Sequence, residues 1–192
     1  MIYPAAVNIV ILQDSTYEQD FVITEAAKAA TLNENTNIIT SACHGFLAND
    51  RVALSVTDGE LPCGITATQN YFVLAAGLTE YSFQISTTSG GSAVDFTITS
   101  PSATYQIGRV IDLTTYTFDA DIRLGYGLGV SASFVCTATN AVAGRLRLSL
   151  TAGTTQALAA ASYVWDLKLI SASSSYFYAK GSITVEATSS RT

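Results

Sequence analysis

Hydrophobic and polar residues alternate along much of the chain with the two-residue period of β-strands. The segment 145–150 (RLRLSL) places leucines on one face and polar side chains on the other. The segment 163–170 (YVWDLKLI) separates an aromatic and leucine face from a face that carries Asp166 and Lys168, and residues 17–23 alternate in the same way. Because successive side chains of a strand point to opposite faces, this pattern predicts strands with one buried face, as in an antiparallel sandwich.

Turn signals separate the alternating segments, and helix signals are nearly absent. The expected turns are Asp58-Gly59, Gly90-Gly91, Gly125 to Gly129, Ala152-Gly153 and Lys180-Gly181. Helical propensity is confined to residues 25–32 (EAAKAATL), a segment too short to form a stable helix by itself. The sequence therefore predicts an all-β protein, an antiparallel β-sandwich with an inserted small β domain.

The pattern also predicts where the insertion lies. Residues 31–107 read as a compact unit of short strands, bordered by an alanine-rich connector at 26–30 and by the Ser-Pro-Ser sequence at 100–102. Residues 1–30 and 108–192 are then expected to form one discontinuous sandwich domain.

The inserted segment carries a series of short motifs. They are, in order, residues 40–46 (TSACHGF), 49–52 (NDRV), 61–65 (LPCGI), 70–73 (NYFV), 81–86 (YSFQIS) and 90–96 (GGSAVDF). In this order they resemble a small β module that is common in the tail and fibre proteins of bacteriophages.

The flanking segments carry a second series of motifs. They are residues 13–21 (QDSTYEQDF), 111–117 (IDLTTYT), 121–123 (DIR), 145–151 (RLRLSLT), 163–167 (YVWDL) and a final strand at 181–187. The series resembles phage baseplate and tail-attachment proteins, including the N-terminal domain of baseplate upper proteins. Thr115 stands where that family usually has glycine, and the insertion is a second departure.

The resemblance implies an architectural function. A protein of this kind holds a fibre or a neighbouring protein in the virion tail, and it is present in the host cytoplasm during assembly. Its expected partners are other phage structural proteins and further copies of itself.

Composition points in the same direction. Hydrophobic residues make up 48% of the chain and charged residues 12%, against about 25% charged residues in a typical soluble domain. Either a membrane or protein partners must then cover apolar surface. A spanning helix needs roughly 20 consecutive apolar residues, whereas the best run, residues 7–12, is interrupted by Asn8. We therefore expect protein partners, no membrane and no secretory signal.

The net charge of −6 without a basic cluster argues against nucleic-acid binding.

The histidine and cysteine residues do not indicate a catalytic or metal-binding site. His44 is the single histidine, and we expect it to form a local hydrogen bond in a turn, with Cys43 facing the other way. The three cysteines, Cys43, Cys63 and Cys136, are expected to be buried free thiols, and a Cys43–Cys63 disulfide is the alternative.

The carboxylates are expected to be structural. Asp119 and Asp121 share one strand face with Arg123, which favours a salt-bridged face over the paired carboxylates of glycoside hydrolysis. An acidic group near residues 14–20 lacks the spacing of a calcium loop. We predict that the protein is not an enzyme, with no catalytic, metal-binding or cofactor-binding residues and no cofactor.

Exposed aromatic residues are the candidate interaction residues. Tyr126 lies in the glycine run 125–129, and Tyr176, Phe177 and Tyr178 follow one another in SSSYFY. Tyrosine and phenylalanine are enriched at protein interfaces, so we expect these side chains to contact neighbouring subunits. The alternative is a platform on which sugars of a host glycan stack.

Overall fold

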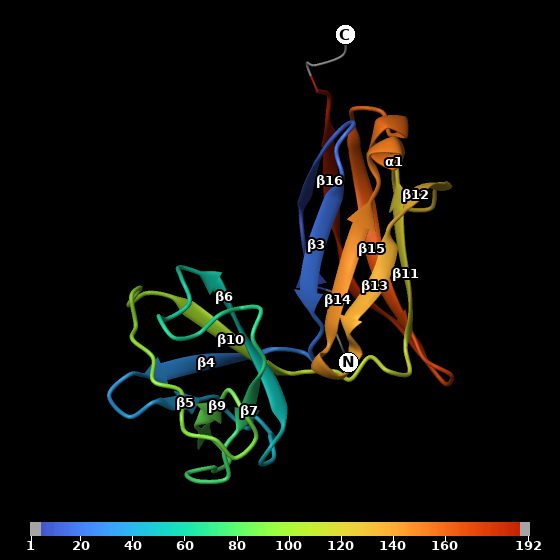
Figure 1. Ribbon diagram of the computed structural model, residues 1–192. Coiled ribbons are helices and arrows are strands. Elements are labelled where there is room, and N and C mark those ends of the chain that lie inside the picture. Colours follow the sequence, from blue (N-terminus) through green and yellow to red (C-terminus); the bar gives the residue numbers. More distant parts are fainter. Residues whose placement is uncertain (1–4, 189–192) are drawn as a thin grey trace. The chain divides into compact units, whose positions relative to one another are not determined.

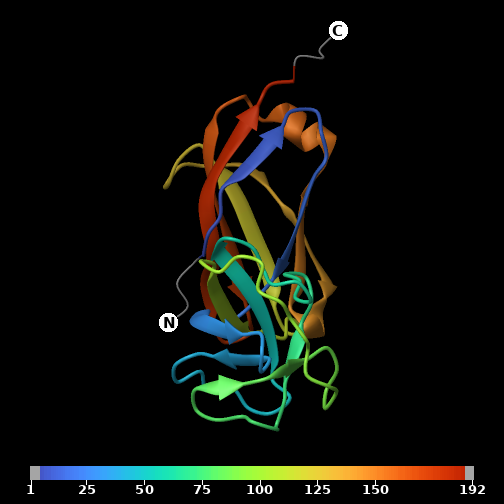
Figure 2. The same cartoon turned by 90° about the vertical axis from the view of Figure 1, so that its left-hand side faces the viewer.

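The computed structural model describes residues 5–188 and shows an almost entirely β protein (Figures 1 and 2). The chain divides into two compact units. Unit 1 combines the segment that ends at Phe21 with the segment that begins at Asp112, and unit 2 spans Val22–Ile111. The expected all-β fold class is thus confirmed.

The larger sheet of unit 1 has six strands in the order β1-β16-β15-β11-β12, with β2 also paired to β16. The strands are β1 (Ala5–Ala6), β2 (Ile9–Leu12), β11 (Thr117–Arg123), β12 (Val130–Ser133), β15 (Ser162–Ile170) and β16 (Ser175–Glu186). Strands β11, β15 and β16 are antiparallel and form the centre of the sheet, whereas β1 and β2 run parallel to β16.

A smaller, three-stranded sheet completes unit 1 in the order β13-β14-β3. Its strands are β3 (Tyr17–Val22), β13 (Val135–Asn140) and β14 (Arg145–Leu150). The side chains between the two sheets are those that the alternation assigned to buried faces. Leu146 and Leu148 of β14 and Leu167 and Leu169 of β15 are all 0% exposed. Trp165 lies 5.8 Å from Phe134, measured between ring centroids. The alternation therefore predicted the buried faces of these strands correctly.

Two short helices lie in unit 1: η1 (Ala141–Ala143), a single 3-10 turn, and α1 (Ala152–Ala157). A turn was expected at Ala152-Gly153, but Thr151 caps a helix there, and its hydroxyl accepts a hydrogen bond from the backbone N–H of Thr154. Within residues 5–188, no helix has the length and hydrophobicity needed to cross a bilayer.

Gly181 lies in the middle of β16, although the sequence predicted a turn at this position. A Cβ at Gly181 would overlap the carbonyl oxygen of Val7. The same oxygen accepts a hydrogen bond of 2.9 Å from Nε1 of Trp165. The glycine therefore allows a close backbone approach inside the sheet and does not mark a turn.

Unit 2 contains a seven-stranded sheet in the order β8-β5-β4-β10-β6-β7-β9. The strands are β4 (Lys28–Asn33), β5 (Ile38–Thr40), β6 (Arg51–Asp58), β7 (Tyr71–Val73), β8 (Ser82–Phe83), β9 (Ile85–Ser86) and β10 (Thr104–Arg109). The first and last strands, β8 and β9, are separated in the chain only by Gln84, so the sheet nearly closes on itself. It surrounds an apolar core that includes Ile39, Tyr71 and Phe83.

The borders of the inserted unit differ from the expected positions. Residues 26–30 were interpreted as a connector and 25–32 as the only segment with helical propensity, yet β4 begins at Lys28 and pairs with β10. Thr24 and Val110 form a further bridge. Pairing with β10 overrides the preference of the alanines for helical structure. Residues 22–30 and 108–111 therefore belong to unit 2 and not to the sandwich.

Candidate functional site

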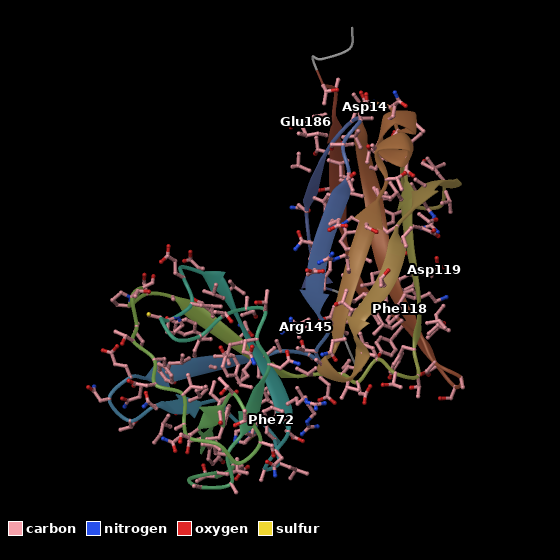
Figure 3. All side chains as sticks on the ribbon, viewed as in Figure 1. Asp14, Phe72, Phe118, Asp119, Arg145 and Glu186 are labelled. Carbon is pink, nitrogen blue, oxygen red and sulfur yellow. The ribbon has the colours of Figure 1, made fainter. Side chains whose placement is uncertain are left out.

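The outward face of the central strands of the larger sheet collects the candidate polar and aromatic residues. Asp119 of β11 is paired with Lys168 of β15, and Lys168 is paired in turn with Phe177 of β16. Asp119 points away from the core, on the exposed side of β11 (Figure 3). The register of three antiparallel strands therefore places an acid, a base and an aromatic ring in one row.

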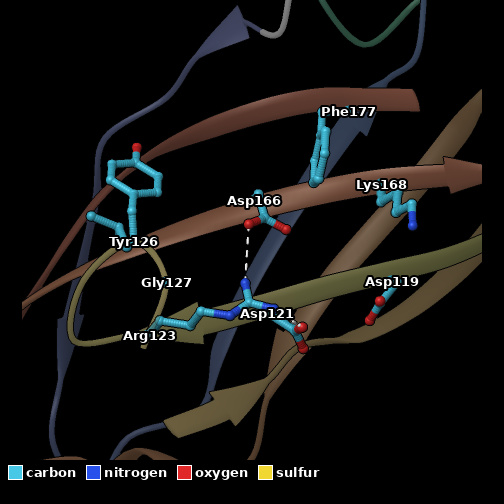
Figure 4. Close-up of a pocket in the computed structure, with 9 residues that line it drawn as sticks. Asp119, Asp121, Arg123, Tyr126, Gly127, Asp166, Lys168 and Phe177 are labelled. Atoms are coloured by element: carbon cyan, nitrogen blue, oxygen red, sulfur yellow. Dashed lines mark hydrogen bonds and ion pairs between the residues drawn. The ribbon is translucent and has the colours of Figure 1, made fainter. Parts of the chain in front are cut away.

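Arg123 holds the second row of this face together. Its guanidinium forms ion pairs with Asp121, its neighbour on β11, and with Asp166 on β15, the latter at 3.1 Å (Figure 4). Burial raises the pKa of Asp166 above its ordinary value, and the positive charge of Arg123 acts in the opposite direction. The expectation that Asp119 and Asp121 share a face with Arg123 is confirmed, and the carboxylate of Asp121 is occupied in a salt bridge.

A shallow pocket of about 260 Å³ opens on this face. The two rows form its floor, and residues of the loop after β11 form one side (Figure 4). Tyr126, from that loop, is 70% exposed and Phe177 is 51% exposed. The pocket therefore combines two accessible aromatic rings with acidic and basic side chains.

The four aromatic residues expected at an interface do not all lie together. Tyr126 and Phe177 line the same pocket. Tyr176 is half-buried, and its ring packs edge-on against Tyr116 with 6.3 Å between the centroids. Tyr178 is half-buried as well and lies at the irregularity in the pairing of β16 with β15, where the partners of Leu167 and Lys168 are Ala179 and Phe177.

The loop that connects β11 to β12 exposes more apolar surface than the sequence analysis singled out. Leu124, Tyr126, Leu128 and Val130 are exposed by 59%, 70%, 57% and 52%. We call residues 124–130 the apolar hairpin. From the sequence, the glycine run 125–129 was expected to form a hairpin or a close subunit contact, with Tyr126 as its interface residue. Leu124 and Val130, which extend the alternation of large apolar residues with glycine in LGYGLGV, were not identified.

His44 lies in the core of unit 2 and is only 4% exposed. Its Nδ1 accepts a hydrogen bond of 2.9 Å from the backbone N–H of Phe46, so the expected local hydrogen bond is confirmed. The ring also stacks on Phe46 and packs edge-on against Phe83. Burial lowers the pKa of His44, while a backbone hydrogen bond with Thr79 acts in the opposite direction. The neutral imidazole is part of the packed core.

The cysteines are free thiols, but their expected burial is wrong in two cases. Cys43 and Cys63 are exposed, and Cys136 is half-buried. Cys43 and Cys63 lie in irregular segments of unit 2, where the Cys43 thiol donates a long hydrogen bond to the Glu80 carboxylate and the remaining contacts are made by the backbone. Cys63, for example, exchanges two backbone hydrogen bonds with Thr97. Burial raises the pKa of the Cys136 thiol to about 11, which makes it unreactive at neutral pH.

The acidic residues Asp14, Glu18 and Asp20 do not form one cluster in the structure. Arg147 of β14 binds Asp20 at 2.7 Å and Glu18 at 3.1 Å. Asp14 lies in the turn before β3 with a positive φ of 63°. Within the described residues, 5–188, histidine, cysteine and acidic side chains form no group of three that suits a metal ion.

No protein-family model matches the chain. A search of curated proteins likewise finds no match.

Proposed function

We propose that this protein is a structural component of a phage virion, a tail, baseplate or fibre-attachment protein that acts through packing between subunits. The phage assignment rests on the sequence motifs in residues 13–21, 40–96 and 111–123. The observation that supports a packing function is the apolar hairpin, where four large apolar side chains are more than half exposed. Contiguous apolar surface of this kind is typical of interfaces with other proteins.

The composition of the chain supports the same proposal. Only 12% of the residues are charged, so little charge is available to keep the apolar hairpin of a free chain in solution. Further apolar side chains are exposed on β2, where Val10 and Leu12 are 61% and 48% accessible. Neighbouring subunits that cover these side chains would remove the apolar surface from water.

The test of the packing function is a hairpin variant. The double substitution Leu124→Ser and Leu128→Ser removes two exposed leucines and no buried contact of the sandwich. We expect the variant to lose the contacts that the hairpin makes, so that light scattering gives a smaller mass or co-purification with co-expressed tail proteins is weaker. The matched control is Leu47→Ser in unit 2, where the leucine is 68% exposed, and it should leave association unchanged. Equal association of both variants and the unsubstituted protein would contradict the proposal.

The phage assignment needs its own test. Gold-labelled antibodies against the protein, applied to virions produced from the genome that encodes it, should label the tail in electron micrographs. Labelling of no virion structure would contradict the assignment.

A second function, recognition of a receptor glycan, is favoured by the pocket on the outward face. Aromatic rings stack on the apolar faces of sugars, and carboxylates accept hydrogen bonds from sugar hydroxyls. Tyr126 and Phe177 offer the rings, and Asp119 offers an exposed carboxylate. Binding on a glycan array that is lost in Phe177→Ala but kept in Tyr81→Ala, a 52%-exposed tyrosine of unit 2, would favour this function.

A further inference from the structure

The segment 130–140 forms an edge of both sheets of unit 1. Strand β12 is the last strand of the larger sheet, beside β11, and β13 is the outermost strand of the smaller sheet, beside β14 (Figure 1). The chain passes from one sheet to the other at Phe134, which is 6% exposed. Among the described residues, 5–188, no strand pairs with the outer side of β12 or β13, so one continuous stretch of chain presents open strand edges.

This stretch lacks charge and proline, two of the usual protections of an edge strand, although the pairing of β13 with β14 shifts register after Ala138 and that of β12 with β11 shifts at Arg123. Its sequence, VSASFVCTATN, contains no charged residue and no proline. Natural proteins normally protect such edges with lysine or other charges, proline, bulges or a covering segment, because an open edge pairs with other chains. Five of the six side chains of β13 are exposed, Val135 by 59%. The strand is therefore accessible to a second chain.

The opposite edge of the same three-stranded sheet is different. There β3 carries Glu18 and Asp20, both of which bind Arg147 on β14. Two copies of β3 placed side by side would bring four carboxylates together. Two copies of β13 would bring together no charge at all, so β13 is the edge of this sheet that tolerates its own copy.

We propose that β13 pairs in antiparallel fashion with β13 of a second copy of this chain, so that two three-stranded sheets join into one six-stranded sheet. This inference rests on the proposed packing function and specifies one of its contacts. The exposed Thr137 suits such pairing, because threonines on neighbouring strands form favourable cross-strand contacts. An antiparallel pair of identical strands is a two-fold contact, which consumes both edges and closes at two copies without growing into a fibre.

The substitution Thr137→Glu tests the contact. Thr137 is paired with Arg147 inside the sheet, so the new carboxylate lies near a positive charge and should not disturb the fold of one copy. In the joined sheet, two such carboxylates would lie on adjacent strands and repel each other. We expect Thr137→Glu to halve the mass measured by light scattering. Thr139→Glu, at a second exposed position of β13, should have the same effect.

Gln19→Glu is the matched control, because it adds the same charge to an exposed position of the other edge strand, β3. It should leave the mass unchanged. Fluorescence of Trp165, the single tryptophan in the chain, verifies that each variant keeps a folded sandwich.

The outcomes separate this inference from the proposed function. If both β13 variants are folded and keep the mass of the unsubstituted protein, the β13 contact is wrong, while packing through the apolar hairpin stands. If the unsubstituted protein is itself a single copy, both proposals fail. A halved mass in the β13 variants alone, with the Gln19→Glu control unchanged, supports the contact.

Discussion

At the scale of single residues, close packing in the sandwich depends on a glycine and on a backbone carbonyl group, not on reactive side chains. Gly181 lets the backbone at Val7 lie against β16, and the Val7 carbonyl oxygen accepts the indole hydrogen bond of Trp165. Trp165 is 1% exposed and is among the largest buried side chains. A buried indole N–H needs this acceptor, because a buried donor without a partner costs about 1–3 kcal/mol.

We predict that Gly181→Ala destabilises the sandwich by roughly 1–3 kcal/mol, since the added methyl group overlaps backbone that has little freedom to move. The measurement is the free energy of unfolding in urea, followed by Trp165 fluorescence. Gly153→Ala is the control, because the nearest atom to its added Cβ lies 3.9 Å away. Gly153 lies in α1, so this variant should be stabilised by up to about 1 kcal/mol. Equal destabilisation in both would contradict the assigned role of Gly181.

At the scale of strands, the outward face of the larger sheet depends on one arginine that joins two strands. Arg123 on β11 pairs with Asp121 on its own strand and with Asp166 on β15. The side chains of Asp121 and Asp166 are 13% and 23% exposed, so their charges are partly removed from water. Loss of Arg123 would leave both carboxylates without their positive partner.

We predict that Arg123→Met destabilises unit 1 by about 1–3 kcal/mol at pH 7. The pKa of Asp166 in the folded protein, already raised by burial, should rise further without Arg123. An acid with a raised folded pKa binds its proton more tightly in the folded state. The loss of unfolding free energy in Arg123→Met, relative to the unsubstituted protein, should therefore shrink as the pH falls towards 4. Urea unfolding of both proteins at pH 7 and at pH 4 measures this difference.

Arg147→Met is the comparison for this prediction. Arg147 also binds two carboxylates, but those of Glu18 and Asp20 are about half exposed, at 54% and 51%. Solvent screens ion pairs at such exposed positions, so this variant should lose less stability than Arg123→Met. A loss as large as that of Arg123→Met would contradict the role given to partial burial.

The strands that the sequence predicted best are those whose alternation covers the whole element. Strands β14 and β15 bury the faces that RLRLSL and YVWDLKLI indicated. The prediction failed where contacts distant in the sequence decide the structure. Residues 28–30, part of the expected connector, lie in β4 and pair with β10, and the glycine at position 181 was interpreted as a turn residue.

The candidate site was only partly predictable for the same reason. The sequence identified Tyr126 and Phe177, but it did not place them in one pocket. That placement depends on the register of β15 with β16, which shifts between Leu167 and Lys168. A shift of one residue reverses the face of every side chain beyond it, and no local pattern marks the position of the shift.

At the scale of the whole molecule, the insertion forms a self-contained unit with neighbouring ends. The backbone N–H of Ile111 donates a 2.9 Å hydrogen bond to the carbonyl oxygen of Ile23, and Thr24 bridges to Val110. The nearly closed sheet has its own apolar core. A unit with a separate core and adjacent ends meets the physical requirements for folding alone.

We predict that residues 22–111, expressed alone, unfold in one cooperative thermal transition, and that a chain in which a short glycine-rich linker replaces them keeps a folded sandwich. Circular dichroism measures the first, and Trp165 fluorescence the second. A fragment without a cooperative transition would contradict the division of the chain into two units.

The central claim is that the exposed apolar surface of this protein packs against other subunits, and the mass of the purified protein in solution tests it most directly. One chain has a mass of 20.2 kDa. Light scattering coupled to size-exclusion chromatography should give a multiple of this mass, with two copies as the smallest assembly. A sharp peak at the mass of one chain, unchanged as the protein concentration is raised, would contradict the account.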